Sequence, residues 1–120
     1  MTKAAISLTT GLEDPEKVTV ALLVALRAAG QRRPTLTMLA KEAVRRAVPA
    51  HARPVACAGC PPLETLMERY AAAGGTMIAC GICVDAKGID EHHLVDNAVK
   101  AGWVQLWEWI GDDHATTFSF

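Results

Sequence analysis

Long apolar runs are missing from this sequence of 120 residues. The longest spans residues 18–30, and it is too short and too amphipathic to cross a lipid bilayer. The N-terminal segment does not resemble a signal peptide, because its apolar part is short and is interrupted by polar residues. These absences predict a cytoplasmic protein without a membrane partner.

An excess of charge of one sign is missing as well: 12 basic and 13 acidic residues give a formal net charge of −1. The densest basic cluster consists of Lys41, Arg45, Arg46 and Arg53. We predict a solvated helix face there and no nucleic-acid partner, because binding nucleic acid would need a basic stripe. A phosphate-binding loop is also absent, since GLEDPEK at residues 11–17 lacks the G-K-[ST] ending.

Strand-like and helix-like segments alternate along the chain, and no linker, repeat or low-complexity segment divides it. Apolar runs bounded by glycine or proline predict strands at residues 4–10, 34–40, 53–57 and 76–80, of which the third is weakened by Pro54. Helical spacing predicts helices at residues 15–30 and 41–48 and between Pro62 and Gly74. The alternation predicts a single α/β domain over residues 1–120, in which helices flank a mostly parallel sheet.

The helix at residues 15–30 has the clearest boundaries. Asp14 suits the cap position, Pro15 suits the first helical position, and Glu16 suits the positive end of the helix dipole. Gly30 tolerates the backbone conformation that ends a helix.

Four cysteines form two C-x-x-C pairs, Cys57 with Cys60 and Cys80 with Cys83. Cys57 and Cys80 each end a predicted strand, and one predicted helix connects the two strands. Chemistry in open parallel sheets gathers at the carboxyl ends of strands. If these strands are neighbours, both cysteine pairs lie at the same edge of the sheet.

One interpretation of the pairs is a tetrathiolate zinc site, because nineteen residues separate them and this spacing is typical of such sites. A second is reactive thiol chemistry. Backbone N–H groups after a strand stabilise a thiolate, and a cysteine three positions on can resolve a mixed disulfide. A third is that the cysteines are small apolar core residues without chemistry.

The order of these features resembles the DsrE/DsrF-like family of small cytoplasmic sulfur-handling proteins. Four stretches carry the resemblance: AAISLTTGLEDPEKV at 4–18, TMLAKEAVRRAV at 37–48, CPPLETLMERYAAAGGTMIACGICVDAKGI at 60–89 and AVKAGWVQLWEWIGDDHATTFSF at 98–120. The most specific match is a cysteine at a strand end with a glycine eight residues on, Cys80 and Gly88.

The resemblance implies a three-layer sandwich with a sheet of five to six strands. It places a strand near residues 97–101, a helix at 103–110 and a final strand at 115–120. It also implies a homo-oligomer, a trimer or a hexamer. In the family the matching cysteine accepts sulfur and passes it on as a persulfide, and this role falls on Cys80.

Together these observations predict a cytoplasmic sulfur carrier, a sulfurtransferase or thiol-redox protein, that holds sulfane sulfur on Cys80. Cys83 is the candidate resolving thiol, and Cys57 and Cys60 form a second candidate thiol pair. The expected partners are sulfur donor and acceptor proteins or small polysulfides, and no cofactor is expected. The alternative is a metal-binding module without turnover, in which all four cysteines hold zinc.

Other side chains are assigned from their positions. His92 and His93 follow the cysteine loop and are expected to be solvated. Lys87 and Lys41 have the charge that favours a thiolate, whereas Asp85 would oppose one. On the tryptophan-rich helix, Trp103 and Trp107 are expected in the core and Trp109 at an interface.

Overall fold

The computed structural model describes residues 1–49 and 58–120. The strands are β1 (Lys3–Leu8), β2 (Thr35–Leu39), β3 (Thr76–Cys80), β4 (Ala98–Ala101) and β5 (Ala115–Ser119). The α-helices are α1 (Pro15–Gly30), α2 (Leu63–Ala72), α3 (Gly81–Ala86) and α4 (Trp103–Ile110). Two 3-10 helices, η1 (Lys41–Ala47) and η3 (Glu91–His93), complete the described elements.

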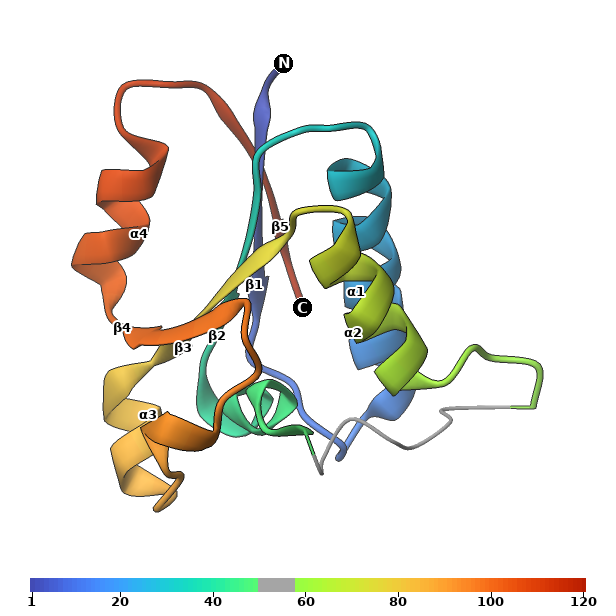
Figure 1. The fold of residues 1–120 in the computed structure, drawn as a ribbon, viewed down its shortest axis with the longest axis vertical. Helices are drawn as coiled ribbons and strands as arrows, with labels where there is room; N and C mark the ends of the chain where they lie inside the picture. Colours follow the sequence, from blue (N-terminus) through green and yellow to red (C-terminus); the bar gives the residue numbers. More distant parts are fainter. Residues whose placement is uncertain (50–57) are drawn as a thin grey trace.

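The five strands form one parallel sheet in the order β4-β3-β2-β1-β5. Helices α1 and α2 lie side by side over one face, and α4 lies over the other (Figure 1). This arrangement confirms the predicted α/β domain with three layers and a parallel sheet. It also confirms the strand, helix and strand expected after residue 97. The strand predicted at residues 53–57 lies outside the described residues. Within the described chain, no helix combines the length and apolar character that a membrane span requires.

Helix α1 begins as its sequence predicts. The Asp14 carboxylate accepts a hydrogen bond from the Lys17 backbone N–H at 3.2 Å, and Pro15 occupies the first turn. A carboxylate in this position satisfies one of the amide groups that a helix start leaves unpaired. Val18, Leu22 and residues on the same face of the helix are buried against the sheet.

The turn that delivers β3 depends on the glycine pair after α2. Gly74 has φ +89°, which favours glycine, and a Cβ on Gly75 would lie 2.2 Å from the Tyr70 ring. Tyr70 is fully buried, and its hydroxyl donates a hydrogen bond to the Thr76 carbonyl at 2.7 Å. The first residue of β3 is thereby attached to α2.

Two sequence predictions about side chains are wrong. Residues 41–47 form the predicted short helix, as a 3-10 helix, but Arg46 is 1% exposed instead of lying on the predicted solvated face. In a 3-10 helix residues three apart share a face, so Arg46 points inward with Ala43. Arg53 of the same basic cluster lies outside the described residues.

The tryptophans of α4 also reverse their predicted roles. Trp103 and Trp107 are 45% and 71% exposed, whereas Trp109 packs against the core. The Lys3 amine lies over the Trp109 ring, 5.0 Å from its centroid. The same amine donates a hydrogen bond to the Trp109 carbonyl. The helix therefore faces the sheet through Trp109 and Leu106, and it leaves the other two rings in solvent.

Candidate functional site

The carboxyl edge of the sheet gathers the segments that follow four of the strands. Cys80 ends β3 and lies beside Ala101 at the end of β4. The segment after β2 joins the same edge, because the Ala40 N–H donates to the carbonyl of Leu8 at the end of β1 at 3.0 Å. In Figure 1, α3 and η1 lie next to each other at this edge. Parallel strands place their carboxyl ends together, which explains why distant sequence segments meet here.

Cys80 is the last residue of β3 and is 4% exposed. It belongs to the core cluster of the domain, so its position is fixed by packing as well as by the strand ladder. Gly81 then starts α3 close to β4, since a Cβ at Gly81 would lie 3.5 Å from Cε of Lys100. The chain thus turns sharply from strand into helix directly after the candidate nucleophile.

Cys83 lies one helical turn after Cys80 and is partly buried against the core. Its Sγ accepts a hydrogen bond from the backbone N–H of Lys41 at 3.2 Å. Lys41 has φ +56°, a left-handed conformation that is uncommon for residues other than glycine. This turn between β2 and η1 presents the amide to the sulfur. The sequence suggested a role for the Lys41 side-chain charge, but the contact is made by its main chain.

The Lys87 amine pairs with the Glu42 carboxylate and not with a described cysteine. Its Nζ lies 2.6 Å from Oε1 of Glu42, and Nε of Arg45 lies 2.9 Å from Oε2 of the same carboxylate. The hydrogen bond from Lys87, and then the one from Arg45, lower the pKa of Glu42. The pair connects the end of α3 to η1, on the side where Lys41 contacts Cys83.

Asp85 is paired as well, on the opposite side of α3. Its Oδ1 lies 2.7 Å from Nζ of Lys100 in β4, and Glu91 lies 3.9 Å from the same amine. The hydrogen bond to Asp85 raises the pKa of Lys100. Helix α3 is therefore attached by ion pairs to η1 on one side and to β4 on the other.

The two histidines are solvated, as predicted. His93 lies in η3 with its side chain 79% exposed, and its Nδ1 is 3.3 Å from Oδ2 of Asp90. His92 is exposed in the same turn. Across residues 1–49 and 58–120, no group of three or more His, Cys, Asp or Glu side chains is placed to hold a metal ion.

The second cysteine pair is only half described. Cys57 lies outside the described residues, whereas Cys60 precedes α2, is half-buried and is disulfide-bonded. The free thiols in the described part of the chain are Cys80 and Cys83. Whether both pairs share the carboxyl edge stays a prediction, and so does a four-cysteine metal site.

Comparison with known proteins finds a match in fold. No family model matches the chain, and no curated protein matches it. Among solved structures, the ychN protein from E. coli superposes with a TM-score of 0.82 over 100% of both chains, at 20% sequence identity. A match at this identity shows that the two chains share the fold.

Proposed function

We propose that this protein carries sulfane sulfur as a persulfide on Cys80, in the cytoplasm. The observation that carries the proposal is the pair of free thiols at the carboxyl end of β3, with the Cys83 sulfur held by the Lys41 amide. A central parallel sheet places chemistry at this edge. The sequence resemblance to sulfur-handling proteins supports the same assignment for Cys80.

The loading step exchanges one sulfur–sulfur bond for another. The Cys80 thiolate attacks the outer sulfur of a donor persulfide or polysulfide, forms a new S–S bond, and displaces the donor as a thiolate. The sulfur atom moves without net oxidation, so no cofactor is needed. An acceptor thiolate that attacks the outer sulfur of Cys80 reverses the exchange and takes the atom away.

Cys83 offers a second fate for the loaded sulfur. Its thiolate attacks Sγ of the Cys80 persulfide, forms a Cys80–Cys83 disulfide, and displaces hydrosulfide. The hydrogen bond from the Lys41 amide positions the Cys83 sulfur in α3, one helical turn after Cys80. The product is an oxidised protein, and a thiol reductant returns it to the starting state.

Cys80 is almost fully buried in the isolated chain, so exchange of sulfur requires α3 to move. Helix α3 has six residues and is attached by ion pairs that reach solvent, which permits such movement at low cost. Donor and acceptor proteins or small polysulfides are the proposed partners. Assembly as a trimer or hexamer is proposed with this function and is checked by native mass.

Intact-mass spectrometry of the full chain tests the proposal. The chain is treated with polysulfide and compared with Cys80→Ser and Cys83→Ser, which are matched single-atom replacements three residues apart. We expect the wild-type chain to gain one sulfur atom and Cys80→Ser to gain none at this site. Cys83→Ser is expected to retain the added sulfur longer, because it cannot form the internal disulfide.

The rival zinc module gives a different pattern in the same experiment. A native mass that is one zinc ion heavier, with thiols that react only after a chelator is added, would refute the carrier and support the four-cysteine site. An equal gain of sulfur in the wild type and in Cys80→Ser would also refute the assignment of Cys80.

A further inference from the structure

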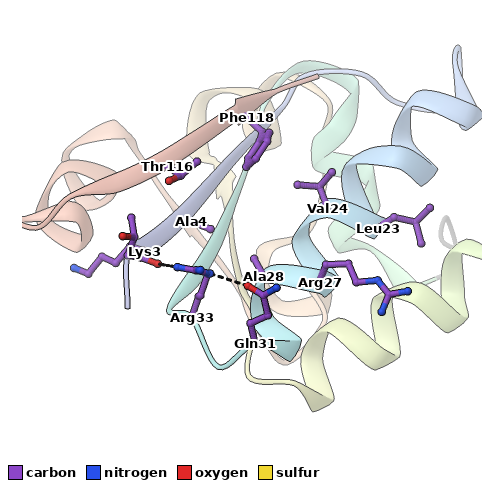
Figure 2. Close-up of a pocket in the computed structure, with 11 residues that line it drawn as sticks. Lys3, Ala4, Leu23, Val24, Arg27, Ala28, Gln31, Arg33, Thr116 and Phe118 are labelled. Carbon is purple, nitrogen blue, oxygen red and sulfur yellow. Dashed lines mark hydrogen bonds between the residues drawn. The ribbon is translucent and has the colours of Figure 1, made fainter.

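A groove of about 590 Å³ lies between α1 and the β5 side of the sheet (Figure 2). Its walls are mostly apolar, and they include Val24 and Ala28 from α1, Ala4 from β1 and Phe118 from β5. Thr2 also lines it, so the groove opens toward the amino ends of the strands. The cysteines lie at the carboxyl ends, and the groove is therefore separate from the site proposed above.

Strand β5 forms the open edge of the sheet beside this groove. The Phe120 N–H donates to the Ser7 carbonyl at 2.8 Å, and the Phe120 carbonyl accepts from the Thr9 N–H at 2.9 Å. In a parallel ladder, alternate residues direct both backbone groups to the same neighbour. The even-numbered residues of β5 therefore bond to β1, and Thr117 directs its N–H and carbonyl outward. No strand of the described residues pairs with that side.

Strand β5 lacks two of the features that protect sheet edges. Residues 115–119 contain no proline and no charged side chain. Proline and charged side chains are two of the features that protect natural edge strands, because unpaired backbone groups attract other strands. Phe118 and Leu23, which line the groove, remain 41% and 38% exposed. Unpaired backbone and exposed apolar side chains thus occur together at β5.

The charge around the groove is positive. Arg27 and Arg33 line it, and none of its 11 lining residues is acidic. Nε of Arg33 donates to the Gln31 side chain at 2.9 Å, and Nη1 of Arg33 donates to the Thr2 carbonyl at 3.2 Å (Figure 2). Arg27 makes no ion pair with any described residue. A second copy of this chain would bring more cations to the groove, whereas an acidic partner would neutralise them.

We propose that an extended, acidic segment of another protein binds here by adding a strand to β5. Its backbone bonds to the outward N–H and carbonyl of Thr117, and its alternate apolar side chains enter the groove against Phe118. Its carboxylates pair with Arg33 at the rim, and Arg27 adds positive charge from the α1 side of the groove. Strand addition obtains affinity from main-chain hydrogen bonds and specificity from pockets for alternate side chains.

Fluorescence anisotropy with a labelled peptide of alternating valine and glutamate tests this site in the full chain. Thr117→Pro removes the outward donor without disturbing the β1 ladder, and Thr117→Val is its matched control, which keeps the amide. We expect Thr117→Pro to abolish binding and Thr117→Val to retain it. Arg27→Glu is expected to weaken binding about tenfold, because the reversed charge repels the glutamates of the peptide.

Three results would overturn the proposal. The first is equal binding of a peptide in which lysine replaces glutamate. The second is unchanged binding by Thr117→Pro, with circular dichroism showing that the variant is folded. The third is a Thr117→Pro variant that binds the peptide normally but has a different native mass from the wild type. This result would show that the β5 edge binds a second copy of this chain. Cys80→Ser serves as a further control and should bind the peptide as the wild type does.

Discussion

Raising the pH is expected to destabilise the fold through Tyr70. Burial raises the pKa of Tyr70 to about 12, despite a hydrogen bond from Thr37 that favours the ionised form. In the unfolded chain, tyrosine ionises near pH 10. Between these values the unfolded state loses a proton that the folded state keeps, so stability that is present below pH 10 is lost as the pH rises toward 12.

The size of this effect follows from the shift. A difference of about two pKa units corresponds to about 3 kcal/mol of unfolding free energy. Tyr70→Phe lacks the ionisable group, so its stability should not show this component. It should instead be less stable at neutral pH by about 1–2 kcal/mol, because the Thr37 hydroxyl and the Thr76 carbonyl lose a buried partner.

Urea unfolding followed by circular dichroism at a series of alkaline pH values measures both effects. Tyr70 is the single tyrosine of the chain, so tyrosinate absorbance reports its ionisation directly. The wild-type and Tyr70→Phe stabilities should converge as the pH rises above 10 and should cross before pH 12, because the loss of about 3 kcal/mol exceeds the difference at neutral pH. If tyrosinate appears near pH 10 in the folded protein, or the two stabilities fall in parallel, the assignment of a buried, hydrogen-bonded Tyr70 is refuted.

Two further predictions concern the segment beside Cys83. Lys41→Val should have an unfolding free energy more than about 1 kcal/mol lower than that of Lys41→Asn. The reason is that a β-branched residue fits φ +56° poorly, whereas asparagine fits it well. Equal urea midpoints for the two variants would contradict this prediction. The ion pair with Lys87 lowers the pKa of Glu42 in the folded state. The pair therefore stabilises the fold at pH values above the ordinary carboxyl pKa, and this stabilisation is lost as the pH falls through the lowered pKa. An acid titration of Glu42→Gln should lack this contribution, and identical acid transitions of variant and wild type would show that the pair does not stabilise the fold.

The sequence predicts the framework of the fold because its signals are local. The cap at Asp14, the proline after it and the apolar run that ends at Cys80 each determine an element from neighbouring residues alone. The later elements, from residue 97 onward, were assigned through the family resemblance. Their own pattern is ambiguous, since β4 has only four residues and little burial.

The features that the sequence did not predict depend on contacts between distant segments. The Lys41 amide reaches Cys83 only because Lys41 adopts a left-handed conformation, and lysine carries no signal for that conformation. Arg46 is buried because η1 is wound as a 3-10 helix, which its apolar spacing did not distinguish from an α-helix. Similarly, the inward position of Trp109 depends on Lys3, more than a hundred residues away.

The attachment of α3 gives the two thiols different mechanical properties. Cys80 is immobilised by the β3–β4 ladder and by the core, and neither depends on charge. Cys83 lies in a short helix whose C-terminal end is held by two ion pairs, Lys87 with Glu42 and Asp85 with Lys100, and both pairs reach solvent. Dissolved ions weaken such pairs, so ionic strength loosens one thiol and leaves the other in place. The salt concentration therefore controls how readily the Cys83 sulfur approaches the Cys80 sulfur.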